Sequence, residues 1–157
     1  MASSDTHATT PDPAAGPVLF AYDGCDLAKL AIEQAGRQLA LGRDALIVCV
    51  WQTNDLGFLP INDRHLNAAD AGEVRAAAEE TAAHGASLAE AAGFRPESMA
   101  IAAAPTWKGI VEVAEERNAS LIVLGPHRRS GLVGHLLGSV TAAVMAHSTA
   151  SVLVVRS

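Results

Sequence analysis

Residues 121–139 read Leu121-Ile-Val-Leu-Gly-Pro-His-Arg-Arg-Ser-Gly-Leu-Val-Gly-His-Leu-Leu-Gly-Ser139. The apolar run at 121–124 predicts a strand, and residues 140–147, just after the quoted stretch, predict a helix. The connection between them holds four glycines, more than a tight turn needs. Glycine lets a backbone approach a ligand closely, and a Gly-Ser pair opening a helix offers N–H groups and a hydroxyl to an anion. The stretch favours phosphate binding; the alternative is a surface loop that ends in Ser139 as an ordinary helix cap.

From residue 17 onward, strand and helix signals alternate along the chain. Strands are predicted at residues 18–22, 45–51, 99–102, 121–124 and 152–155, and helices at 28–39, 71–92, 107–117 and 140–147. Thr106 is expected to cap the third of these helices. Regular alternation with continuous apolar strands predicts right-handed crossovers and a mainly parallel sheet with helices on its faces.

Length and composition favour one compact domain. The chain has 157 residues, of which 50% are apolar, enough for a single core. Residues 1–16 are small and polar and contain proline, so they are expected to form a disordered leader. The domain is then expected to cover residues 17–157.

Charge and hydropathy argue against several classes of partner. A net charge of -6 disfavours nucleic-acid binding and an anionic membrane surface, since both need a basic face. No apolar run approaches the roughly 18 residues of a spanning helix, and the N-terminus has no secretory signal pattern. The two cysteines suggest neither a disulfide framework nor a zinc site. A cytoplasmic protein is the expectation.

A second candidate motif follows the first predicted strand. Asp23-Gly24 stands directly after residues 18–22. Ligands of open parallel sheets bind beyond the carboxyl ends of the strands, at the point where strand order reverses. If the first and fourth strands are neighbours there, Asp23 and the glycine stretch face one crevice. Asp23 would then bond a ribose or help to hold a hydrated divalent ion; otherwise it is the N-cap of the first helix.

Three segments together resemble the universal stress protein family. They are Val18-Leu-Phe-Ala-Tyr-Asp-Gly24, the glycine stretch, and Ser151-Val-Leu-Val-Val155. The resemblance covers residues 17 to 156. It implies an α/β fold: a single-domain three-layer sandwich with a five-stranded parallel sheet of order 3-2-1-4-5, of the nucleotide-binding α-hydrolase-like type.

The resemblance also implies ATP binding and a set of contact residues. Ribose and base would meet Asp23 and the backbone of Ala21 and Tyr22, and the Tyr22 ring would crowd or cover the base. The remaining implied contacts are Val50 for adenine, Leu124, Gly125 and His127 for the sugar and first phosphates, and Gly138, Ser139, Val140 and Thr141 for the phosphate chain. Mg²⁺ or Mn²⁺ would accompany the nucleotide, although the sequence has no dedicated metal cluster. AMP or cyclic AMP would satisfy the same pocket.

Arg128 departs from the family pattern. The ATP-binding branch has glycine at this position, between the glycines that match Gly125 and Gly138. An arginine at a positive φ strains the turn by about 1 kcal/mol and occupies space needed by phosphate. It could instead pair with a phosphate through two hydrogen bonds, or lie in solvent.

Two functions of different classes follow. One is an ATP-binding stress-response regulator that acts through ligand-dependent dimer or partner contacts. The other is an interaction module of the same fold that does not bind ATP and works through dimerisation and protein partners. No catalytic constellation is present in the sequence, and the family implies at most slow ATP hydrolysis or self-phosphorylation. The apolar segment 151–155 is expected to form a sheet edge that joins a homodimer.

Overall fold

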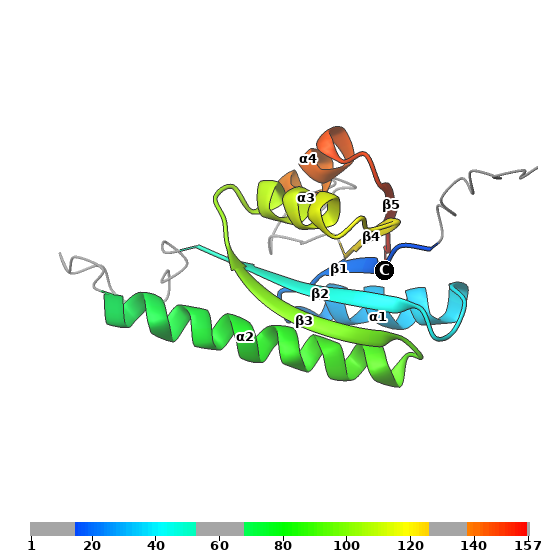
Figure 1. The fold of residues 1–157 in the computed structure, drawn as a ribbon, viewed down its shortest axis with the longest axis horizontal. Coiled ribbons are helices and arrows are strands. Elements are labelled where there is room, and N and C mark those ends of the chain that lie inside the picture. Colours follow the sequence, from blue (N-terminus) through cyan, green and yellow to red (C-terminus); the bar gives the residue numbers. More distant parts are fainter. Residues whose placement is uncertain (1–14, 53–67, 126–137, 157) are drawn as a thin grey trace, which may run out of the picture.

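A computed structural model of the chain describes residues 15–52, 68–125 and 138–156. Strands and helices alternate along it (Figure 1). The strands are β1 (Val18–Ala21), β2 (Asp44–Trp51), β3 (Arg95–Ala102), β4 (Leu121–Leu124) and β5 (Ser151–Val154). The helices are α1 (Asp26–Gln38), α2 (Ala68–Ala91), α3 (Thr106–Glu116) and α4 (Ser139–His147).

The five strands form one parallel sheet in the order β3-β2-β1-β4-β5. This confirms the predicted fold class and the predicted strand order. The order reverses between β1 and β4, which pair with Phe20 opposite Val123. The next strand after β1, β2, lies on one side of β1, and β4 lies on the other. Because β1 and β4 are parallel neighbours, their carboxyl ends lie side by side.

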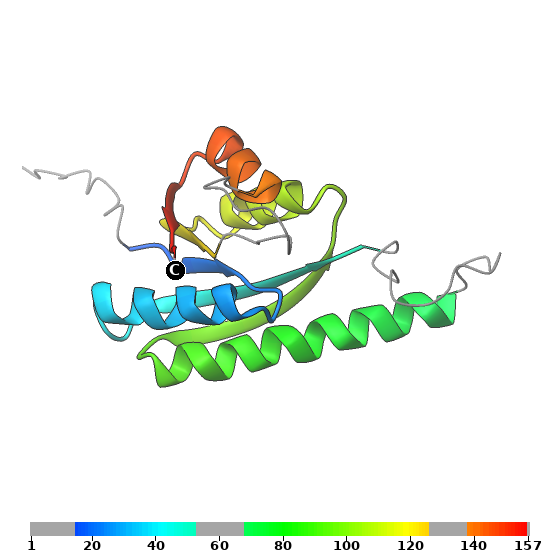
Figure 2. The ribbon, with the colours of Figure 1, turned by 180° about the vertical axis from the view of Figure 1, so that it is seen from behind.

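Helices cover both faces of the sheet, α1 and α2 on one and α3 and α4 on the other (Figures 1 and 2). Alternate residues of β1 serve the two layers, as the two-residue period of a strand requires. Val18 and Phe20 pack in the core with α1 residues such as Ile32, whereas Leu19 packs with Ile110 of α3 and Val144 of α4. The β1 strand is therefore the centre of the molecule.

Two predicted boundaries were wrong in an informative way. β3 begins at Arg95, four residues before the predicted start. The prediction missed this first half of the edge strand because Arg95, Glu97 and Ser98 are exposed and polar and so give no apolar pattern. Thr106 does not cap α3. The cap residue is Pro105, and the Thr106 hydroxyl accepts a hydrogen bond from Nε2 of Gln52 at 2.9 Å.

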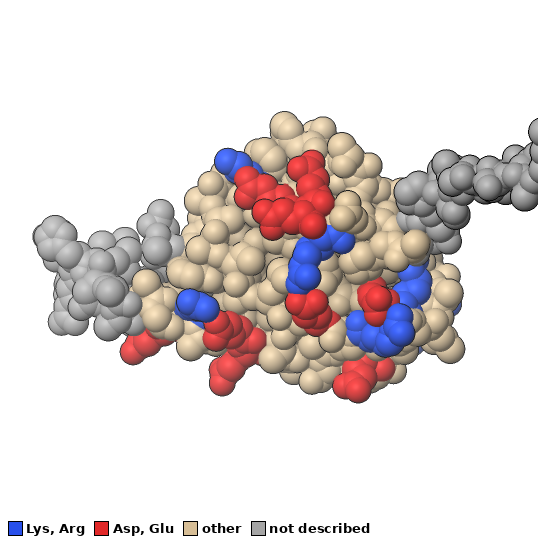
Figure 3. Space-filling model, viewed as in Figure 1, with Lys and Arg blue, Asp and Glu red and all other residues tan. Residues whose placement is uncertain are grey.

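The surface over α3 and β3 carries charges of both signs (Figure 3). Arg95 pairs with Asp44 at 2.9 Å, and Arg117 pairs with Glu97. These side chains are well exposed, and exposed pairs contribute little to stability. Among the described helices, none has the length and apolar character that a membrane crossing requires.

Candidate functional site

The two sequence motifs lie at the same edge of the sheet. Asp23 follows β1 and Gly125 follows β4. Because β1 and β4 are parallel neighbours, both turns leave the sheet at its carboxyl edge, where the strand order reverses. The juxtaposition that the sequence argument required is therefore present.

Asp23 stands in an exposed turn between β1 and α1. Its Oδ1 accepts a hydrogen bond from the backbone N–H of Cys25 at 3.0 Å, while Gly24 has a φ of 83°. A positive φ of this kind is readily adopted only by glycine. Asp23 is not the helix cap: that position is Cys25, whose Sγ accepts the N–H of Ala28 at 3.4 Å.

Cys25 is held in a chemically quiet state. Partial burial raises the pKa of its thiol above the ordinary value, and a hydrogen bond to the Asp23 carboxylate raises that pKa further. The thiolate is the reactive form of cysteine. The observed role of this thiol is to cap α1.

The Tyr22 ring points away from the carboxyl edge. It is 2% exposed and packs among the residues of α1 and α2, on the same face as Phe20. Its hydroxyl lies 2.8 Å from Nδ1 of His84 in α2. The alternation of β1 turns the side chain of residue 22 toward α2, so the buried ring is held on that face of the sheet.

Val50 presents backbone groups on the β1 side of the sheet, beyond the end of β1. Alternate residues of β2 direct their peptide groups to opposite neighbours: Val48 accepts the N–H of Tyr22, and Trp51 accepts the N–H of Ala103. By this alternation Val50 faces the β1 side. The β1–β2 ladder ends at the pair Ala21 and Val48, so Val50 lies two residues beyond the last paired residue of β2. The Ala21 and Val50 side chains pack toward α3.

Gly125 lies against the first turn of α1. A Cβ at this position would come within 2.6 Å of the carbonyl carbon of Leu27, so only glycine permits this approach. Its neighbour Leu124 is buried, and the Leu124 carbonyl accepts the N–H of Val155 at 2.9 Å. The end of β4 is thereby fixed between α1 and β5.

The start of α4 has the character of an anion site. Its N-cap is Gly138, not Ser139, and among the residues that the structure describes no side chain caps its first turn. Early N–H groups of a helix lack internal partners and favour negative charge. Ser139 is exposed, Val140 half-buried and Thr141 buried. Two other predicted site residues, His127 and Arg128, lie outside the described residues.

Sequence reasoning missed the contribution of α2. His84 and Thr81 approach the Asp23 turn from that helix. Nothing in the alanine-rich pattern of residues 71–92 distinguishes them. The only sequence signal was the two-residue period of β1, which places Tyr22 on the α2 side.

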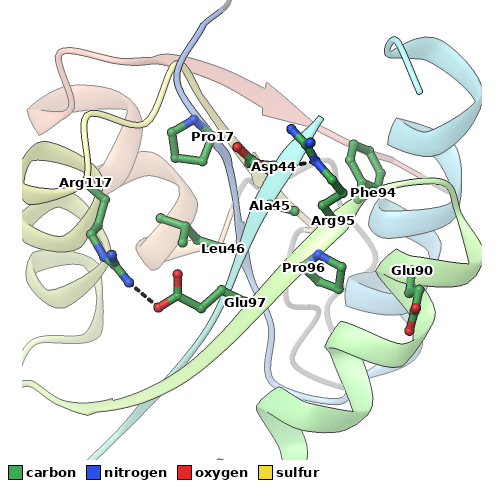
Figure 4. A pocket seen from close by; sticks show the side chains of 10 residues that line it. All are labelled: Pro17, Asp44, Ala45, Leu46, Glu90, Phe94, Arg95, Pro96, Glu97 and Arg117. Carbon is green, nitrogen blue, oxygen red and sulfur yellow. Dashed lines mark hydrogen bonds and ion pairs between the residues drawn. The ribbon is translucent and has the colours of Figure 1, made fainter. Parts of the chain in front are cut away.

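A concavity lies at the opposite, amino edge of the sheet (Figure 4). Its volume is ≈ 540 Å³, and its walls include Pro17, Leu46 and Phe94. The Arg95–Asp44 and Arg117–Glu97 pairs line it, so four of its charged side chains are paired with one another. Ligands of such sheets bind at the carboxyl edge, and the candidate site remains there. In the part of the chain that the structure describes, no group of three or more His, Cys, Asp and Glu side chains is arranged for a metal ion.

Comparisons with known proteins agree with this architecture. The model of the universal stress protein family matches residues 15–156. Universal stress protein Rv2005c of Mycobacterium tuberculosis is 31% identical over 160 residues, which cover 95% of this chain and 48% of that protein. The chain therefore spans about half the length of the curated relatives that it matches.

Solved structures share the fold. That of hypothetical protein MJ0577 has a TM-score of 0.72 at 22% identity and covers 92% of this chain and 97% of its own. A universal stress protein in complex with cAMP has a TM-score of 0.57 at 26% identity, covering 91% of this chain and 98% of its own. The chain belongs to the universal stress protein family.

Proposed function

We propose that this chain is an adenine-nucleotide-binding regulator of the stress response, with ATP as its ligand. The observation that carries the proposal is the placement of Asp23 and Gly125 at one edge of the sheet, where the strand order reverses. The proposal assigns the start of α4, whose N-cap is Gly138, to the same site. A family member solved with cAMP supports adenine-nucleotide binding in general. ATP in particular, a cytoplasmic location and contacts with protein partners belong to the proposal.

The chemistry of the edge residues suits the three parts of such a ligand. Asp23 offers carboxylate oxygens to the ribose hydroxyls, together with the backbone of Ala21 and Tyr22. Val50 offers a backbone donor and acceptor to adenine. The phosphates are assigned to the backbone of Leu124 and Gly125, to His127, and to the first turn of α4 at Gly138, Ser139, Val140 and Thr141. An accompanying Mg²⁺ would be held mainly by phosphate oxygens.

The nucleotide content of the purified protein tests the proposal. Acid release followed by chromatography is expected to yield an adenine nucleotide, and the retention time tells ATP from AMP and cyclic AMP. Protein free of nucleotide that also takes up none from solution would favour the alternative, an interaction module that works through dimerisation and protein contacts.

Arg128 is expected to tune ATP affinity. Arg128→Gly restores the family pattern, and calorimetric titration of both proteins with Mg-ATP compares them. A gain of about tenfold, worth 1.4 kcal/mol, means that the arginine obstructs the phosphates. A comparable loss means that its guanidinium binds them. Equal affinities would contradict the expectation and show that Arg128 lies in solvent.

We further propose that two copies join through β5. Among the described strands, β5 lies at an edge of the sheet, next to β4, and its residues are mostly half-buried. Unpaired N–H and C=O groups at such an edge favour pairing with another strand, and a two-fold axis closes the assembly at two. The neighbouring helix α4 adds an apolar outer face, where Ala142, Met145 and Ala146 are exposed.

Val154→Pro is expected to weaken this dimer without breaking the sheet. The N–H of Val155 donates to Leu124 inside the sheet, so the N–H of Val154 points to the free edge. Proline removes that donor and should raise the dimer dissociation constant by about tenfold, the loss of one or two hydrogen bonds. Leu153→Pro is the matched contrast. The backbone N–H of Leu153 points toward β4 inside the sheet, so its replacement by proline should lower the melting temperature. Light scattering that gives a monomer mass for the unmodified protein at micromolar concentration would defeat the dimer itself.

A further inference from the structure

The turn that carries Asp23 rests on α2 at both of its ends. Tyr22, the residue before Asp23, places its hydroxyl 2.8 Å from Nδ1 of His84. Gly24, the residue after it, faces Thr81, whose Cγ2 would lie 3.5 Å from a Cβ at position 24. Thr81 and His84 are one turn apart in α2. The turn therefore packs against α2 through the residues on both sides of Asp23.

The contact between Tyr22 and α2 fits closely. A Cβ at Gly85 would come within 2.7 Å of Cδ1 of Tyr22 and of Cγ2 of Ile47, so glycine at this position makes room for the ring. The Tyr22 and His84 ring centroids are 6.1 Å apart. Because Tyr22 is only 2% exposed, its hydroxyl has little access to water as an alternative hydrogen-bond partner.

Tyr22 is also held by its backbone. Its N–H donates to the carbonyl of Val48 at 2.9 Å. On the far side of the turn, Cys25 donates its N–H to Asp23 at 3.0 Å. The His84 contact is a side-chain hydrogen bond that connects this turn to α2, a helix outside β1 and α1.

We propose that His84 is a positioning residue for the nucleotide site. Through the hydroxyl of Tyr22, it holds the Asp23 turn at the place where the ribose binds, although His84 itself does not touch the ligand. In the tautomer that carries its proton on Nε2, an imidazole accepts the Tyr22 O–H at Nδ1. The inference rests on the proposed nucleotide site, but its geometric core, the fixing of the turn by α2, can be measured without any ligand.

The test compares variants that remove the hydrogen bond with one that keeps it. Tyr22→Phe and His84→Ala each lose it, and each should raise the dissociation constant of Mg-ATP about 3- to 10-fold. His84→Asn retains an acceptor at the same number of bonds from the backbone and should stay within about twofold of the unmodified protein. The double variant Tyr22→Phe/His84→Ala should bind no worse than either single variant, because both changes remove the same interaction.

A second measurement reads the turn itself. Amide hydrogen exchange at Cys25, followed by NMR in nucleotide-free protein, should quicken in Tyr22→Phe and His84→Ala and not in His84→Asn. The Val155 amide, bonded in the sheet, should exchange at an unchanged rate in all of them. Ser87→Ala, a change on the same helix one turn further along, is the matched control and should alter neither quantity.

The outcomes separate the two claims. If the unmodified protein binds no nucleotide, the proposed function fails while the Cys25 exchange still decides whether His84 holds the turn. If His84→Ala leaves Cys25 exchange unchanged, or if His84→Asn weakens binding as much as His84→Ala, the positioning role is overturned. General loss of helix stability does not explain the expected effect, since alanine is the better helix former at an exposed position.

Discussion

Gly138→Asp is expected to abolish ATP binding while leaving the fold intact. Gly138 is the N-cap of α4 and has a φ of -57°, which any residue adopts. Aspartate is a favoured N-cap, so α4 itself should become more stable. The added carboxylate would stand where the proposal puts phosphate, and two charges about 4 Å apart near a protein surface repel by roughly 4 kcal/mol. The affinity should therefore fall by about 100-fold or more, as measured by calorimetry with Mg-ATP.

Gly138→Asn separates charge from shape in this experiment. Asparagine caps helices about as well as aspartate and has nearly the same size, but it is neutral. Like Gly138→Asp, it should raise the melting temperature, but it should lower the ATP affinity much less than Gly138→Asp does. Equal binding by the aspartate variant and the unmodified protein would show that phosphates do not lie at the start of α4.

Gly125→Ala is expected to destabilise the whole domain. The new Cβ would lie within 2.6 Å of the Leu27 carbonyl carbon and 3.0 Å of the Ala28 nitrogen. Both are backbone atoms of α1, which cannot rotate away as a flexible side chain can. Overpacking of this kind typically costs about 1–3 kcal/mol, and we expect the upper part of that range in the free energy of unfolding, measured with urea. Any nucleotide affinity should fall as well, because β4 and α1 must separate.

The control for this prediction is Gly72→Ala in α2. A Cβ there meets nothing within 4 Å, and alanine is favoured over glycine in a helix by roughly 0.5–1 kcal/mol. This variant should therefore gain stability. If Gly125→Ala were as stable as the unmodified protein, the close approach of β4 to α1 would be wrong.

Much of the fold could be predicted from the sequence because most of its strands are short apolar runs that alternate with helical patterns. The run Leu121–Leu124 was predicted with its correct bounds, since both of its faces are covered. β3 was predicted in its second half only, because Arg95, Pro96 and Glu97 at a sheet edge carry no apolar period. Propensity at one position misled as well: Thr106 looks like a cap, yet its hydroxyl serves Gln52.

The site was predictable where backbone geometry defines it. Asp23 and Gly125 follow from strand ends and sheet topology, which the sequence pattern carries. The support from α2 could not be predicted, because the contact between Tyr22 and His84 joins residues 62 positions apart. Such pairs arise from the packing of a helix on a sheet, and one sequence contains no signal for its exact rotation.

Calorimetric titration with Mg-ATP tests the central claim most directly. The protein is first freed of any nucleotide that remained bound through purification, and the melting temperature is measured with and without ligand. The account predicts one ATP per chain, heat on binding, and a higher melting temperature at saturation. No heat and no thermal shift at millimolar Mg-ATP would contradict it.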